Sequence, residues 1–93
     1  MLARCKALGD IDRATAPSFN AELRDVIDNA DEAFVNVDCS GLMFVDSAGY
    51  HAFVDATSYA IRRGHTLVIR NLSPSCARLF RLCDLDRELH IEP

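Results

Sequence analysis

The fold is decided by residues 33–64, which read AFVNVDCSGLMFVDSAGYHAFVDATSYAIRRG. Residues 33–37 form a short apolar run rich in β-formers and too brief for a helix, which predicts a largely buried strand that ends at Asp38. Residues 39–45 predict a connecting link with Gly41 as its turn point. The first part of this stretch therefore predicts a largely buried strand followed by a link.

Its second part predicts a helix packed on a sheet. Asp46-Ser47 is typical of a helix start, and the helix is expected to end near Gly64. Apolar residues recur between these points at i, i+3, i+4, i+7 and i+11: Gly49, Ala52, Phe53, Ala56 and Ala60. Because most of these residues are small, the helix is expected to approach its sheet closely.

The preceding segment predicts a strand and a helix of its own. Residues 2–8 indicate a strand that ends at Gly9, closed by an acidic turn over residues 9–12. Thr15-Ala16-Pro17 predicts the start of the next helix, because proline is tolerated in a first helical turn and a threonine just outside it can cap a free amide. An apolar stripe then runs to about Asn29: Phe19, Leu23, Val26 and Ile27.

The segment after residue 64 repeats this alternation. Residues 65–70 contain another buried strand, and Ser73-Pro74 predicts a cap followed by proline at the first helical position. The third helix carries a stripe of apolar residues: Cys76, Leu79, Phe80 and Cys83. Leu89 and Ile91 then suggest a last short strand.

The resulting order is β-α-β-α-β-α-β, which predicts the α/β class with helices packed on a mainly parallel or mixed sheet. Partners and ligands of such sheets meet the carboxyl ends of strands and the starts of the helices that follow. Residues 39–51 are therefore the first region in which to seek a site.

Composition bounds the class further. The chain has 93 residues, 49% of them hydrophobic, which predicts a single domain over residues 1–93. A net charge of -4 argues against a nucleic-acid partner. No apolar run approaches the length of a membrane span and no signal-peptide pattern follows Met1, so we expect a cytoplasmic protein without a membrane partner.

The cysteines carry no metal-binding or redox motif. They form no CxxC pair and lie among apolar neighbours: Cys5, Cys39, Cys76 and Cys83. We therefore expect buried, reduced thiols, and we expect no metal and no cofactor.

Residues 38–49, DCSGLMFVDSAG, resemble the signature of the STAS domain, the fold of bacterial anti-sigma factor antagonists. That family shows a strand ending in Asp, a short apolar link, and Asp-Ser-x-Gly opening a helix. Residues 9–12 followed by Thr15-Ala16-Pro17 resemble its first turn and helix, and residues 73–85 resemble its third helix through Ser73-Pro74, Leu79-Phe80 and Leu85. The resemblance covers nearly the whole chain, although we expect the family's first strand and last helix to be missing.

The resemblance implies a function. Ser47 would be the phosphoacceptor for a kinase that is also an anti-sigma factor, and Asp12 would contact that partner. The remaining partner-binding positions would surround Ser47: Asp46, Ala48, Gly49, Tyr50 and His51. The unphosphorylated chain would bind the anti-sigma factor and release a sigma factor, and phosphorylation would end binding. The chain itself would not be an enzyme, and a second copy of it could be a further partner.

The residues alone support Ser47 less specifically. If Asp46 caps the helix, Ser47 lies in its first turn, where backbone amides and the helix dipole favour an added phosphate by up to about 1 kcal/mol. Taken alone, Asp46 and Ser47 favour no more than a good helix start. Ala48 and Tyr50-His51 depart from the family's pattern and leave the partner's identity open.

Two other functions remain open. The chain could be a STAS-like scaffold without a phosphoswitch, or a subunit of a larger assembly such as a transporter. Ser47, His51 and Asp55 are spaced i, i+4 and i+8, which invites a hydrolase triad, but no Gly-x-Ser-x-Gly elbow surrounds Ser47. The evidence for a metal site formed by Asp46, His51 and Asp55 is weaker still.

Tyr50 could be either a partly buried ring or an exposed anchor for a partner.

Overall fold

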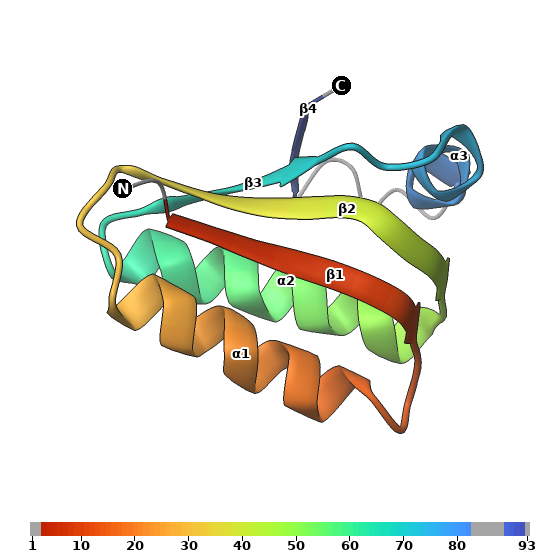
Figure 1. The fold of residues 1–93 in the computed structure, drawn as a ribbon, viewed down its shortest axis with the longest axis horizontal. Helices are drawn as coiled ribbons and strands as arrows, with labels where there is room; N and C mark the ends of the chain where they lie inside the picture. Colours follow the sequence, from red (N-terminus) through yellow and green to blue (C-terminus); the bar gives the residue numbers. More distant parts are fainter. Residues whose placement is uncertain (1–2, 83–88, 93) are drawn as a thin grey trace.

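The computed structural model describes residues 3–82 and 89–92, and it confirms the predicted α/β class. The elements are β1 (Ala3–Ile11), α1 (Ala16–Asp28), β2 (Phe34–Val45), α2 (Ser47–Arg62), β3 (Thr66–Arg70), α3 (Pro74–Leu82) and β4 (His90–Glu92). All neighbouring strands are parallel, in the order β1-β2-β3-β4. Figure 1 shows α1 and α2 side by side along one face of this sheet.

The strand at the start of residues 33–64 is longer than predicted. β2 continues through residues 39–45, so the predicted link with a turn at Gly41 is wrong. Gly41 pairs with Leu8 of β1, and a Cβ at Gly41 would lie 2.6 Å from Leu8 Cδ2. Gly41 therefore makes room for a side chain of the neighbouring strand.

β1 also continues past its predicted end. It runs through Gly9 to Ile11, so the acidic turn does not close it at Gly9. The pairing with β2 shifts between Lys6 and Leu8 and again between Gly9 and Asp10, and Gly9 has a φ of 64°. A glycine in this conformation permits an irregularity inside a strand, which local sequence cannot distinguish from a turn.

The helix starts agree with prediction at α2 and α3. Asp46 caps α2. At α3, Ser73 Oγ accepts a hydrogen bond from Cys76 N at 3.2 Å, and Pro74 is the first residue of the helix. At α1, Pro17 lies in the first turn as predicted, but the Thr15 side chain makes no capping bond to the helix. Its hydroxyl donates instead to the carbonyl oxygen of Asp10 at 2.9 Å.

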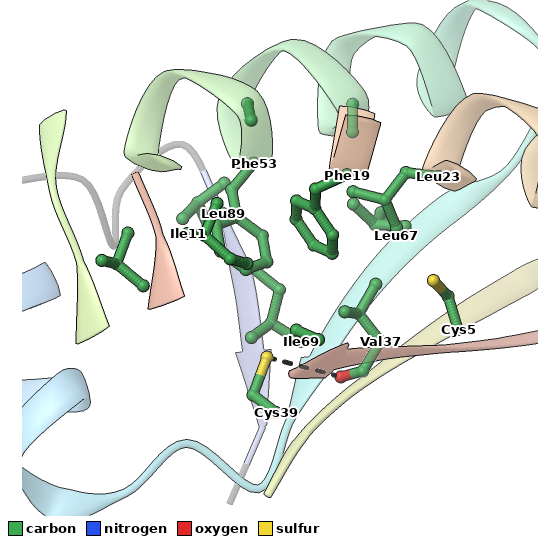
Figure 2. Packing of buried hydrophobic residues seen from close by; sticks show 14 of the residues in the cluster. Cys5, Ile11, Phe19, Leu23, Val37, Cys39, Phe53, Leu67, Ile69 and Leu89 are labelled. Atoms are coloured by element: carbon green, nitrogen blue, oxygen red, sulfur yellow. Dashed lines mark hydrogen bonds between the residues drawn. The ribbon is translucent and has the colours of Figure 1, made fainter. Parts of the chain in front are cut away.

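The core lies between the helices and one face of the sheet (Figure 2). The ring of Phe53 on α2 meets Phe19 of α1 at 5.1 Å and Phe80 of α3 at 5.7 Å between centroids, both edge to face. Leu67 and Ile69 of β3 are fully buried beneath them. The predicted stripes of α1 and α2 face this core.

Three of the four cysteines are described, and each is a buried free thiol: Cys5, Cys39 and Cys76. Burial raises the pKa of Cys39 to about 12, and its Sγ donates to the carbonyl oxygen of Val37 at 3.9 Å (Figure 2). The predictions for Cys83 and Leu85 lie outside the described residues. On α3, Leu79 is 42% exposed, so this member of the predicted stripe does not belong to the core.

Candidate functional site

The candidate site lies where β1 and β2 end and the helices after them begin. Parallel strands bring these two ends to the same edge of the sheet, as Figure 1 shows. Asp46 N donates to the carbonyl oxygen of Ile11 at 3.2 Å, and Arg13 N donates to Asp46 Oδ2 at 3.3 Å. Two segments more than thirty residues apart in sequence are thereby joined into one surface.

Asp46 fixes the start of α2. Its backbone is extended, and its Oδ1 accepts a hydrogen bond from Gly49 N at 3.1 Å, which satisfies an amide that the helix leaves without a partner. Ser47 is the first residue of α2, and its side chain is exposed. The prediction that Ser47 lies accessible at a helix N-terminus is confirmed.

Gly49 is buried at the point where α2 approaches β1. A Cβ at this position would lie 2.4 Å from the carbonyl oxygen of Ile11 and 2.6 Å from Val45 Cγ1. The close approach therefore requires glycine two residues after Ser47. Gly49 is buried and supports the start of α2 from beneath.

Asp12 organises the neighbouring turn. Its Oδ1 accepts hydrogen bonds from Ala14 N at 2.9 Å and from Thr15 N at 3.1 Å, while its own amide donates to Thr15 Oγ1 at 2.9 Å. The hydrogen bond from the Thr15 amide is the largest cause of a lowered pKa at Asp12. The Asp12 carboxylate is therefore ionised and held in place beside the start of α2.

The residues after Ser47 differ in exposure. Ala48 is half-buried and His51 is exposed, whereas Tyr50 is 7% exposed. The Tyr50 ring packs edge to face on Phe80 with 4.7 Å between centroids. Of the two interpretations of Tyr50, the structure supports the buried ring, because most of its surface is already covered within the chain.

A shallow groove of about 400 Å³ separates the first turns of α1 and α2. Its small apolar residues include Ala16, Pro17 and Ala52, and its polar rim includes Arg13 and His51. Across the groove, Asn20 Nδ2 donates to the carbonyl oxygen of Ala52 at 3.2 Å. This bond joins α1 to the second turn of α2.

The geometry supports neither the hydrolase triad nor the metal site that the sequence suggested as alternatives. Ser47, His51 and Asp55 all project exposed side chains from α2, and no hydrogen bond within the described residues joins them. In the part of the chain that the structure describes, no group of three His, Cys, Asp or Glu side chains could hold a metal ion. None of the described helices is long and apolar enough to cross a membrane.

Two members of the site were not found from sequence. The backbone of Arg13 holds Asp46, and Thr15 holds the Asp12 turn through its hydroxyl. The Asp-x-x-Thr spacing was a usable signal for the turn, because Asp and Thr side chains bond backbone amides two or three residues away. The contact of Arg13 is long-range and left no local pattern.

A model of the STAS domain family matches residues 6–93. The chain therefore belongs to the STAS domain family, as the Asp-Ser-x-Gly segment indicated. The match begins within β1 at residue 6 and includes both segments that form the site.

Solved structures share the fold at low sequence identity. An anti-sigma factor antagonist from Mycobacterium paratuberculosis has a TM-score of 0.81 at 20% identity, covering 97% of this chain and 75% of the other. A sulfate transporter family protein from Wolinella succinogenes has a TM-score of 0.76 at 16% identity, covering 95% and 73%. Identities this low establish the architecture and leave the partner open.

A third neighbour is the anti-sigma factor antagonist SpoIIAA in its unphosphorylated form. Its TM-score is 0.69 at 14% identity, covering 97% of this chain and 77% of the other. The Bacillus protein SpoIIAA in its phosphorylated form has a TM-score of 0.67 at 16% identity, covering 97% and 81%. Both forms of that protein share this architecture.

Proposed function

We propose that this chain is an anti-sigma factor antagonist that binds an anti-sigma factor kinase when Ser47 is unmodified and releases it when Ser47 is phosphorylated. The observation that carries the proposal is the exposed Ser47 side chain at the first position of α2, flanked by the capping carboxylate of Asp46. Structural neighbours that are anti-sigma factor antagonists, one of them solved in both phosphorylation states, support it. Catalysis would belong to the partner.

The surroundings of Ser47 explain how one phosphoryl group could act as a switch. The start of α2 favours an added negative charge through free amides and the helix dipole. The Asp46 carboxylate repels this added charge, because the amides of Gly49 and Arg13 hold the carboxylate beside Ser47. A phosphate adds roughly -1.5 to -2 charges to this surface, so a docked partner is repelled while the fold tolerates the change.

The partner would dock on the surface around Ser47. The organised turn of Asp12, the exposed His51 and the half-buried Ala48 all lie at this end of the molecule. Fixed groups lose little freedom when a partner binds, which favours affinity. A cytoplasmic location, in which the kinase and ATP are available, is part of this proposal.

Mass spectrometry tests the proposal after incubation with the candidate anti-sigma factor kinase and ATP. We expect one phosphoryl group on the wild type and on the matched control Ser58→Ala, an exposed serine of the same helix. Ser47→Ala should accept none and still bind the partner. Ser47→Asp should bind at least about tenfold more weakly with a near-wild-type melting temperature, because the added charge acts at the docking surface.

Two results would contradict the switch. Transfer of the phosphoryl group to Ser40 or Ser58 would remove Ser47 from its role. Equal partner affinity of wild type, Ser47→Ala and Ser47→Asp would instead favour a second candidate, a STAS domain that serves as a subunit of a larger assembly. The structural neighbour from a sulfate transporter family supports that candidate.

A further inference from the structure

The face of the sheet opposite to α1 and α2 carries mainly polar side chains in a regular arrangement. The strand register aligns two rows across all four strands: Arg4, Asn36, Val68 and His90, and then Lys6, Asp38, Arg70 and Glu92. The apolar exception in these rows is Val68, which is 1% exposed. Residues that alternate with these along β1 and β2, such as Cys5 and Val37, face the helices and are buried. We call the surface formed by these two rows the outer face.

The outer face contains a hollow of about 540 Å³. It is lined by six residues of three strands and the segment after β3: Arg4, Phe34, Asn36, Asp38, Arg70 and Asn71. These residues lie on the sheet, away from the helix starts that carry Ser47. The hollow is therefore separate from the surface of the proposed switch.

Most polar groups of the hollow already have partners. Arg70 donates to Asn36 Oδ1 at 2.7 Å and forms an ion pair with Glu92 at 2.8 Å. Asp38 Oδ1 accepts from Asn71 Nδ2 at 3.1 Å and from the Ser40 amide at 3.0 Å. This network fixes the floor of the hollow before any ligand arrives.

Two groups of the hollow remain available. Arg4 has an exposed side chain and makes no hydrogen bond or ion pair with any other residue among 3–82 and 89–92. Phe34 is 54% exposed, although it is a large apolar side chain. A free guanidinium beside an exposed ring offers an ionic contact and an apolar contact at one place, and Arg and aromatic residues are enriched among energetic centres of interfaces.

The charge of the outer face differs from that of the whole chain. Its two rows contain three cationic side chains, Arg4, Lys6 and Arg70, and two carboxylates, Asp38 and Glu92. With His90 neutral the rows carry a net charge of +1, whereas the chain carries -4. The two rows thus carry a small positive net charge on an acidic protein, and this charge favours an acidic partner.

We infer that the outer face is a second docking surface and that it takes an acidic segment of a partner protein, in which a carboxylate lies next to an apolar side chain. The carboxylate would pair with the Arg4 guanidinium and the apolar side chain would cover Phe34. The positive charge of the rows would favour this segment over a basic one. Docking here would not depend on the phosphorylation of Ser47.

The test uses an octapeptide in which glutamate alternates with phenylalanine, and its analogue with lysine in place of glutamate. Backbone amide resonances of the ¹⁵N-labelled protein are followed during titration at neutral pH and low salt. We expect the acidic peptide to shift the amides of Arg4, Phe34 and Asn36, and the lysine analogue to leave them unchanged. Added salt should weaken binding, because exposed charges are screened.

Variants separate docking from other effects. Arg4→Gln should weaken binding about tenfold, because an ionic hydrogen bond is lost at an exposed position, and Phe34→Ala should also weaken it. Arg78→Gln, an exposed arginine of α3, is the matched control and should bind like the wild type. Ser47→Asp should bind equally well, so that failure of the switch and failure of this inference give different results.

Several outcomes would overturn the inference. The acidic peptide could perturb residues 46–55 instead of the outer face, or both peptides could bind alike. Inorganic phosphate could displace the peptide and produce the same shifts, which would indicate a simple anion site. Light scattering that shows a dimer through the outer face would assign this surface to a second copy of the chain.

Discussion

Gly49 connects the fold to the site at the scale of a single residue. The carbonyl oxygen of Ile11 that a Gly49 Cβ would meet at 2.4 Å is the same oxygen that accepts the Asp46 amide. Any displacement of this carbonyl would move Asp46, and with it the first turn of α2 that presents Ser47. The space at Gly49 therefore controls how the candidate phosphoacceptor is held.

We predict that Gly49→Ala lowers the free energy of unfolding by about 1–3 kcal/mol, because overpacking forces backbone to move. Gly41→Ala is the matched control. Its Cβ would meet Leu8 Cδ2 at 2.6 Å, but Leu8 is 66% exposed and can change rotamer, so the loss should be smaller. Urea unfolding of both variants measures the difference, and equal losses would contradict the assigned contact.

At the scale of elements, a cross-strand network joins β2 to the end of β3. Asn71 follows β3 with a φ of 62°, a left-handed conformation that asparagine tolerates better than most residues. From there its side chain donates to Asp38 in the middle of β2. This bond is the largest cause that lowers the pKa of Asp38 to about 2, followed by hydrogen bonds from Ser40.

We predict that Asn71→Gly raises the pKa of Asp38 towards its ordinary value of 3.8, because the variant removes the amide while glycine keeps the backbone conformation. Carboxyl ¹³C shifts of Asp38 followed against pH measure this change. Asn29→Gly, which removes an exposed amide elsewhere, should leave the midpoint unchanged. An unchanged Asp38 midpoint in Asn71→Gly would contradict the network.

The hydrogen bond between Asn71 and Asp38 also makes the stability of the fold depend on pH. The pKa of Asp38 is lower in the folded chain than in the unfolded one, so the unfolded chain takes up the proton first as pH falls. The stabilisation from ionised Asp38 is therefore present above about pH 3.8 and is lost as pH falls towards about 2. In Asn71→Gly the pH range over which this stabilisation is lost should become narrower, because the folded-state pKa of Asp38 rises towards 3.8.

Helix starts could be predicted from sequence, whereas the ends of β1 and β2 could not. Asp46 and Ser73 cap α2 and α3 through amides three residues away, which a short pattern encodes. β2 passes through Gly41 because Leu8, more than thirty positions earlier, needs the space above it. A glycine that serves a cross-strand contact has the same local pattern as a glycine in a turn.

In the candidate site, too, only the features encoded by neighbouring residues could be predicted from sequence. The accessible start of α2 at Ser47 came from local pattern and resemblance. The contact of Arg13 with Asp46 and the burial of Tyr50 against Phe80 did not, because both depend on elements that are distant in sequence. The proposed role of Ser47 remains a prediction that the Ser47 variants test, and the partner contact of Asp12 remains a prediction.

At the scale of the whole molecule, aromatic contacts link all three described helices. Phe53 of α2 touches Phe19 of α1 and Phe80 of α3, and Phe80 also touches Tyr50. The Phe53 side chain is fully buried at the centre of this chain of contacts. Burial of such rings is a main source of stability in a domain of this size.

We predict that Phe53→Ala lowers the free energy of unfolding by about 3–5 kcal/mol, because it leaves a cavity where three helices meet. That is a large fraction of the roughly 5–15 kcal/mol that stabilises a typical domain. Ile61→Ala is the matched control: Ile61 lies on the same helix and is 64% exposed. Its effect should stay within about 0.5 kcal/mol.

The same variants test whether the three helices unfold together. In a Tyr59→Phe background, tyrosine fluorescence reports Tyr50 beside α3, and far-ultraviolet circular dichroism reports all helices. If Phe53 joins the helices into one cooperative unit, the two urea transitions coincide with and without Phe53→Ala, and both shift together. Loss of the Tyr50 signal at clearly lower urea than the helical signal would mean that α3 unfolds separately. The start of α2 would then have to hold Ser47 in place without support from Phe80.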